Sequence, residues 1–140
     1  MQAGLKNKTA IVTGASRGIG RAIALKLGQS GASVVVNYAN NAKAADEVVS
    51  QITENGGQAV SLRADMQKIS EIKALFEASE RHFGSIDILV NNAGIALFKK
   101  IADITEKEFD DSFALNVKGL FFACQQAAQK MTDGGKIINI

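Results

Sequence analysis

The feature that most constrains the fold is a repeated alternation of short β-branched runs with longer segments of helical periodicity. Three of the runs are almost continuous Ile, Val and Leu, as in parallel strands that are buried on both faces. The third run along the chain alternates polar and apolar residues, which suits the edge of a sheet. The alternation predicts a three-layer α/β fold, a doubly wound parallel sheet with helices on both faces. The predicted strands are 9–13, 33–37, 58–62, 86–90 and 136–140.

The segments between these runs carry apolar residues at helical spacing. The last segment opens with Thr105-x-x-Glu108, which is a capping box and marks a helix start. Each segment is followed by glycine where a left-handed helix cap is expected, at Gly31, Gly56, Gly84 and Gly134. We therefore expect helices over about 19–27, 45–52, 69–83 and 105–131.

The amino-acid composition excludes several classes of protein. The chain has 140 residues, of which 46% are hydrophobic, so a single domain over 1–140 can bury a core. A formal net charge of +2 is too small for a nucleic-acid footprint, and no apolar run is long enough for a membrane span. Cys124 and His82 are the only residues of their kinds, which excludes a disulfide framework and a Cys/His zinc site. We expect a soluble, cytoplasmic protein that binds no metal, nucleic acid or membrane.

A glycine-rich turn follows the first predicted strand. Ligands of a doubly wound sheet bind beyond the carboxyl ends of its strands, which is where residues 13–20 lie. Gly14, Gly18 and Gly20 leave backbone N–H groups free at a helix start and place no Cβ in the way, as a dinucleotide pyrophosphate requires. The turn matches neither the G-x-G-x-x-G fingerprint nor a phosphate-binding loop that ends in Gly-Lys-Ser/Thr. A purely structural strand–helix turn is the alternative.

Three motifs together resemble one family. These are the T-G-x-x-x-G-I-G pattern of residues 13–20, Asn91-Asn92-Ala93-Gly94 after the fourth strand, and Asn116-Val117-Lys118-Gly119 within the fourth helix. Over residues 7–140 the chain resembles classical short-chain dehydrogenases/reductases, and is similar to 3-oxoacyl-[acyl-carrier-protein] reductases and glucose-dehydrogenase-like members. The resemblance implies a Rossmann-like sheet of strand order 3-2-1-4-5 that lacks the family's last strands. It also implies hydride transfer between a nicotinamide and a carbonyl or alcohol carbon.

The end of the second strand bears on the choice of cofactor. A carboxylate there would bind the free ribose hydroxyl of NAD(H) and repel a 2′-phosphate, but this chain has Asn37. Arg17 can reach a 2′-phosphate with a charge-assisted fork, and Ser16 and Asn37 can add hydrogen bonds. A solvated surface cation is the alternative for Arg17. Together these residues favour NADP(H) over NAD(H).

The resemblance also assigns roles to single residues. Asp65 would bind the adenine amino group, although it could equally cap the third helix. Asn91, Ala93 and Gly94 would line the ribose and nicotinamide, whereas Asn92 would be structural. The full set of expected cofactor contacts is Gly14, Ser16, Arg17, Gly18, Ile19, Gly20, Asn37, Asp65, Met66, Asn91, Ala93 and Gly94.

Asn116 is the expected catalytic residue. Its spacing places it within the apolar stripe of the fourth helix, with Phe109, Phe113 and Leu120. A buried unpaired amide costs about 1–3 kcal/mol, so Asn116 needs a partner that helical spacing alone does not supply. A satisfied core amide is one interpretation. The resemblance gives the other, an active-site asparagine that holds a water in a proton relay to a catalytic lysine.

The rest of the family's catalytic set is not found in this sequence. The resemblance places a serine beyond the fifth strand and a Tyr-x-x-x-Lys pair in the following helix, but Tyr38 is the only tyrosine and Ala42 lies four residues after it. We expect the amino-terminal half of an enzyme that acts on a small carbonyl or alcohol substrate as a dimer or tetramer. The alternative is a catalytically inactive nucleotide-binding or interaction module. A methyltransferase on a similar sheet would leave Arg17, Asn37 and residues 91–94 without a purpose.

Overall fold

A computed structural model describes residues 4–140. Its sheet has five parallel strands in the order β3-β2-β1-β4-β5, which confirms the predicted fold class and strand order. The edge position of β3 agrees with its alternating sequence. The strands are β1 (Thr9–Val12), β2 (Ser33–Tyr38), β3 (Gln58–Arg63), β4 (Ile88–Asn91) and β5 (Lys136–Asn139).

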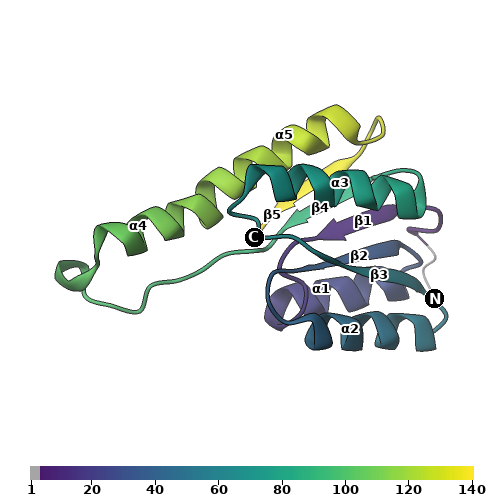
Figure 1. Ribbon diagram of the computed structural model, residues 1–140. Helices are drawn as coiled ribbons and strands as arrows, with labels where there is room; N and C mark the ends of the chain where they lie inside the picture. The colour runs from purple at the N-terminus through teal and green to yellow at the C-terminus, as the bar shows by residue number, and fades with distance from the viewer. Residues whose placement is uncertain (1–3) are drawn as a thin grey trace.

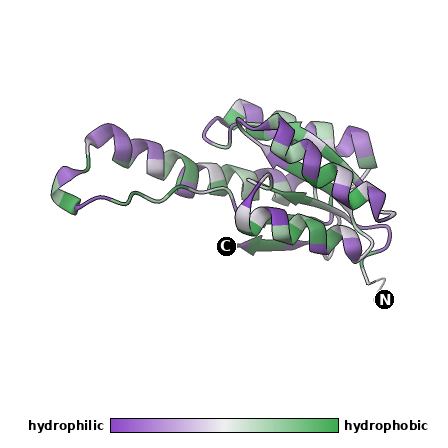
Figure 2. Ribbon diagram, turned by 90° about the horizontal axis from the view of Figure 1, so that it is seen from below, coloured by the Kyte–Doolittle hydropathy of each residue, from purple (hydrophilic) through white to green (hydrophobic). Residues whose placement is uncertain are grey.

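Helices cover both faces of the sheet (Figure 1). Helices α1 (Gly18–Gln29) and α2 (Ala42–Glu54) lie on one face, and α3 (Ile69–Phe83) and α5 (Leu120–Lys130) lie on the other. Successive residues of β2 serve the two layers, since Val34 and Val36 join the cluster with α1 and α2 while Val35 joins the cluster with α3 and α5. Figure 2 shows the hydrophobic colour concentrated on the strands between these helices.

Glycines follow the ends of α1, α2 and α3 as expected, but α5 ends at Lys130 with Met131 as its cap residue, so the expectation of a helix cap at Gly134 was wrong. Gly31, Gly56, Gly84 and Gly134 have φ angles of 96°, 82°, 81° and 80°, in the region that glycine adopts without strain. The capping box at Thr105 and Glu108 is also present, with both of its hydrogen bonds. No helix within residues 4–140 combines the length and the apolar character that crossing a bilayer requires.

The fourth predicted helix is helical from Glu106 to Lys130 but is not α-helical throughout. Helix α4 (Glu106–Phe113) passes into a π-helical segment at Ala114–Gly119 and then into α5. In Figure 1, α4 and the chain before it extend away from the sheet. As a result Phe109 and Phe113, which the apolar stripe placed against the core, are 52% and 49% exposed. The expectation of a buried stripe was therefore wrong for this part of the helix.

The buried carboxylate of Asp87 accepts hydrogen bonds from several segments at the amino-terminal end of the sheet. Asp87, which is 6% exposed, accepts hydrogen bonds from the Thr9 N–H (2.9 Å), the Thr132 hydroxyl (2.8 Å) and Lys8 Nζ (3.4 Å). Burial by itself would raise the pKa of Asp87, but the bonds from Thr9, Thr132 and Lys8 outweigh it, so the pKa lies below its ordinary value.

We expect Asp87→Ala to lower the free energy of unfolding by about 3 kcal/mol, because the buried Thr9 N–H loses its acceptor. The ionised form stabilises the fold above the pKa of an unfolded Asp, roughly 3.9, and that contribution is lost as the pH falls through the lower folded-state pKa. Urea unfolding at neutral pH and below about pH 4 checks both statements. An Asp87→Ala protein as stable as the unmodified one at neutral pH would contradict this role.

Candidate functional site

The glycine-rich turn connects β1 to α1 at the carboxyl edge of the sheet. Gly14 and Gly18 have φ angles of 59° and 56°, so the turn needs the left-handed region twice. Helix α1 begins at Gly18, its cap residue Arg17 makes no side-chain cap bond, and its first turn contains no acidic residue. Both Arg17 and Ile19 are exposed. The start of α1 is therefore an open, electropositive helix end of the kind that binds anions.

Two asparagines hold the turn from opposite sides. Asn37 Oδ1 of β2 accepts a hydrogen bond from the Gly14 N–H at 3.1 Å. Asn92 Nδ2, just after β4, donates to the carbonyl oxygens of Thr13 and Gly14, each at 3.0 Å. A Cβ on Gly20 would overlap both Asn92 Nδ2 and the Gly14 carbonyl oxygen. Glycine at position 20 therefore lets α1 pack closely against the turn, and Asn92 has the structural role expected of it.

The structure corrects the expected role of Asn37. Its side chain is buried, with 1% exposure, and its amide donates to the carbonyl oxygens of Leu62 and Ala64, both at 3.2 Å. Since Oδ1 is also occupied by Gly14, the side chain has no bond left for a cofactor phosphate. Strand β2 ends at the half-buried Tyr38, one residue later than predicted.

The end of β3 is tied to the start of α3. The Asp65 N–H donates to Glu71 at 2.6 Å, and Asp65 Oδ1 accepts from the Gln67 N–H at 2.9 Å. The bond from Asp65 is the main reason that the pKa of Glu71 lies below its ordinary value, with Lys68 and Arg63 adding to the effect. Helix α3 begins at Ile69 with Lys68 as its cap residue, so the alternative that Asp65 caps this helix was wrong. Met66 beside it is buried.

The segment after β4 lies against the glycine-rich turn. The backbone N–H groups of Asn92 and Ala93 donate to the Thr13 hydroxyl at 3.0 and 2.9 Å. A Cβ on Gly14 would come within 3.0 Å of Ala93 Cα. Asn91 is buried, and its amide donates to Asn139 Oδ1 of β5 at 2.9 Å and to Cys124 Sγ at 3.4 Å. Small residues thus bring the ends of β1 and β4 into contact.

Asn116 lies in the π-helical segment and pairs with the backbone of Ile95. Its amide donates to the Ile95 carbonyl oxygen at 2.8 Å, and its Oδ1 accepts from the Ile95 N–H at 2.9 Å. A Cβ on Gly94 would lie 3.2 Å from the same Oδ1. Asn116 is exposed, which corrects its expected burial. Besides Ile95, in the chain after β4, its partner is the Ser112 hydroxyl of α4, which accepts from its amide at 3.4 Å. Short π-helical segments are frequent at functional sites.

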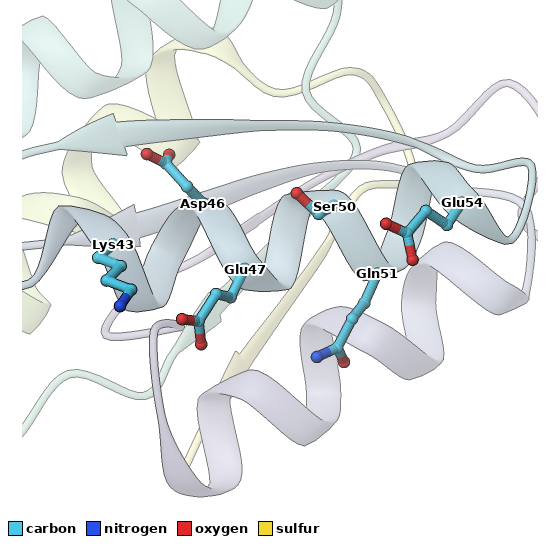
Figure 3. Close-up of a pocket in the computed structure, with 6 residues that line it drawn as sticks. All are labelled: Lys43, Asp46, Glu47, Ser50, Gln51 and Glu54. Carbon is cyan, nitrogen blue, oxygen red and sulfur yellow. The ribbon is translucent and has the colours of Figure 1, made fainter.

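A hollow lined by polar residues of α2 carries no comparable chemistry. It lies on the outer face of α2 (Figure 3). Gln51 in it accepts a hydrogen bond from Arg21 of α1, and Asp46 accepts one from Ser61 of β3. These are contacts along the polar face of an amphipathic helix, away from the carboxyl edge of the sheet. The lining residues are Lys43, Asp46, Glu47, Ser50, Gln51 and Glu54.

The carboxyl edge is therefore the candidate site. The ends of β1, β2, β3 and β4 bring three separate stretches together there, namely 13–20, 64–66 and 91–94. Asn116 adjoins them through Ile95 and Gly94. Ser16, which was also expected at the cofactor, is half-buried within the turn.

We compared the sequence and the structure of this chain with those of known proteins. The short chain dehydrogenase family matches residues 8–140. The short chain dehydrogenase/reductase nsrJ of Aspergillus novofumigatus is 48% identical over 134 residues, which are 96% of this chain and 51% of nsrJ. A Burkholderia cenocepacia short chain dehydrogenase solved in complex with NADP is 38% identical with a TM-score of 0.93, over 96% of this chain and 55% of its own. Landomycin C-6 ketoreductase LanV, solved with NADP and rabelomycin, is 46% identical with a TM-score of 0.91, over 96% of this chain and 58% of its own.

This chain spans about half the length of the curated relatives that it matches. Within that half, the match runs from the residue before β1 to the residue after β5. It includes the glycine-rich turn, the Asn91–Gly94 segment and the asparagine of the π-helical segment. The chain therefore belongs to the short chain dehydrogenase family.

Proposed function

We propose that this chain supplies the cofactor half of an NADP(H)-dependent oxidoreductase that transfers hydride between the nicotinamide and a carbonyl or alcohol substrate. The observation that carries the proposal is the start of α1, which is open, free of acidic residues in its first turn, and flanked by the exposed Arg17. Such a helix end attracts a pyrophosphate, and a guanidinium beside it attracts a further phosphate.

The residues present fit a dinucleotide. Gly14 and Gly20 are positions where a side chain would fill the turn, which leaves the backbone of 14–20 to approach the pyrophosphate. Arg17 would bind the 2′-phosphate with help from Ser16, and Gly18 and Ile19 would offer backbone N–H groups. Asp65 and Met66 would lie at the adenine. Asn91, Ala93 and Gly94 would line the ribose and nicotinamide.

The bound nicotinamide would supply the hydride or accept it, and the chain's own residues would position it. Asn116, paired with Ile95, would stand at the active site and hold a water in the proton relay. We propose that the serine and the Tyr-x-x-x-Lys pair belong to a longer polypeptide, because the relatives are about twice as long as this chain. A catalytically inactive nucleotide-binding module of this length is the alternative. The intact mass of the natural protein and a carbonyl-reduction assay separate the two.

The substrate class and assembly are also proposed. LanV was solved with rabelomycin, which supports a small carbonyl compound as the substrate here. Exposed apolar side chains follow α4, the π-helical segment and α5, which supports packing of this helix against a second subunit in a dimer or tetramer. They are 49% to 61% exposed and belong to Phe109, Phe113, Val117 and Phe121. A small net charge supports a protein that binds neither nucleic acid nor membrane, and we place it in the cytoplasm.

Cofactor choice gives the test of the proposed function. We expect Arg17→Ala to weaken NADPH binding about tenfold and to leave NADH binding within about twofold, because only NADPH carries the phosphate that a charge-assisted bond would reach. Fluorescence titration of the complete polypeptide with each dinucleotide measures both affinities. Equal binding of NADH and NADPH by the unmodified protein would contradict the assignment to NADP(H).

A further inference from the structure

We infer that Asn37 is a positioning residue, whose buried amide sets the glycine-rich turn against the end of β3 and so aligns the two halves of the adenosine-phosphate site. This inference rests on the proposed function. The turn and the β3 end come from separate parts of the chain, and Asn37 bonds to both. We assign it no contact with the cofactor.

The hydrogen bonds of Asn37 restrain both the glycine-rich turn and the end of β3. Its Oδ1 accepts from the Gly14 N–H, and its backbone carbonyl oxygen accepts from the Ala15 N–H at 2.8 Å. Two successive peptide groups of the turn are therefore hydrogen-bonded to Asn37. Its amide donates to the Leu62 and Ala64 carbonyl oxygens, directly before the segment that would hold the adenine. A displacement of β3 relative to β1 is thereby transmitted to the turn.

Only an amide satisfies this environment. The site presents one donor, the Gly14 N–H, and three acceptors, the carbonyl oxygens of Leu62 and Ala64 at 3.2 Å and of Tyr38 at 3.5 Å. An ionised carboxylate at position 37 could still accept from Gly14 but would face these carbonyl oxygens without a hydrogen to donate. With 1% exposure, no solvent relieves the mismatch. The amide therefore differs from a carboxylate of the same size in a way that a binding experiment can detect.

The test compares Asn37→Ala and Asn37→Asp with Asn55→Asp in the complete polypeptide. Asn55 is an exposed residue at the end of α2, far along the chain from the turn, so it controls for the added charge. We expect Asn37→Ala to raise the Kd and the KM for NADPH about tenfold or more while kcat at saturating NADPH stays within about threefold. A purely structural role would lower the amount of folded, active protein and leave KM unchanged.

The pH profile of Asn37→Asp gives a second readout. Burial and the facing carbonyl oxygens raise the pKa of a carboxyl at this position, and its protonated form regains one donor. We expect a Kd penalty relative to Asn55→Asp that is larger at about pH 8 than at about pH 5. Titration with ADP-ribose, which lacks the 2′-phosphate, must show the same trend, since otherwise repulsion of that phosphate explains the effect.

The outcomes separate the inference from the proposed function. If unmodified protein binds NADPH and Asn37→Asp matches Asn55→Asp at both pH values, the positioning role is overturned and the proposed function stands. If unmodified protein binds no dinucleotide, the proposed function fails and the inference fails with it. Should Asn37→Ala not fold, the profile of Asn37→Asp decides alone.

Discussion

Gly20→Ala is expected to weaken NADPH binding at least about thirtyfold, equivalent to about 2 kcal/mol. The added Cβ would overlap the Gly14 carbonyl oxygen and Asn92 Nδ2, and the first of these is backbone that cannot rotate away. Either α1 moves out or the turn opens, and in both cases the N–H groups of the helix start lose their alignment with a pyrophosphate. Isothermal titration with NADPH measures the loss.

Gly4→Ala is the matched control for this substitution. A Cβ on Gly4 meets no described atom within 4 Å, and its φ lies outside the strained region. We expect its affinity for NADPH to equal that of the unmodified protein. A Gly20→Ala protein that is folded and binds NADPH as tightly as Gly4→Ala would show that the turn does not hold the cofactor.

Gly119→Ala is expected to lower the free energy of unfolding by about 3 kcal/mol. Gly119 is the buried end of the π-helical segment, and a Cβ there would overlap the backbone carbonyl oxygen of Met66. Because neither partner is a flexible side chain, the segment must shift away from the loop that follows β3. The shift also moves Asn116, so we expect carbonyl reduction by the complete polypeptide to fall with the stability.

Thermal and urea unfolding of Gly119→Ala beside Gly4→Ala check this prediction. The loss is expected in the midpoint of the transition, with the slope unchanged if the unfolded states are equally exposed. An unfolding free energy within about 0.5 kcal/mol of the control would mean that the contact between Gly119 and Met66 is easily relieved, which would contradict the geometry described here.

The layers of the fold could be predicted because local pattern and global packing agree, whereas the strand order was implied by the resemblance to the family. The buried runs around Ile11, Val35 and Leu89 require a sheet covered on both faces, and the alternation in β3 places it at the edge. Glycines with positive φ mark the ends of α1, α2 and α3, because no other residue adopts that backbone easily. The three motifs that identify the family lie together at the carboxyl edge, as strand topology requires.

The features that could not be predicted depend on contacts between distant segments. The buried position of Asn37 follows from the register of β2 with β3. Its bonds to Leu62 and Ala64 join residues far apart in the sequence, so residue spacing within β2 does not predict them. The exposure of Asn116 follows from the path of α4 beyond the sheet, whereas helical periodicity alone places it among apolar residues. The π-helical turn adds residues to the helix, which shifts every later position of the stripe.

The most direct test of the central claim is a backbone amide spectrum of the complete polypeptide, titrated with NADPH. We predict that the N–H resonances of Gly18, Ile19 and Gly20 shift most, because a pyrophosphate at the start of α1 changes their hydrogen bonding, whereas the Gly14 N–H stays bonded to Asn37. A titration in which these resonances stay in place, while those lining the outer face of α2 shift, would contradict it.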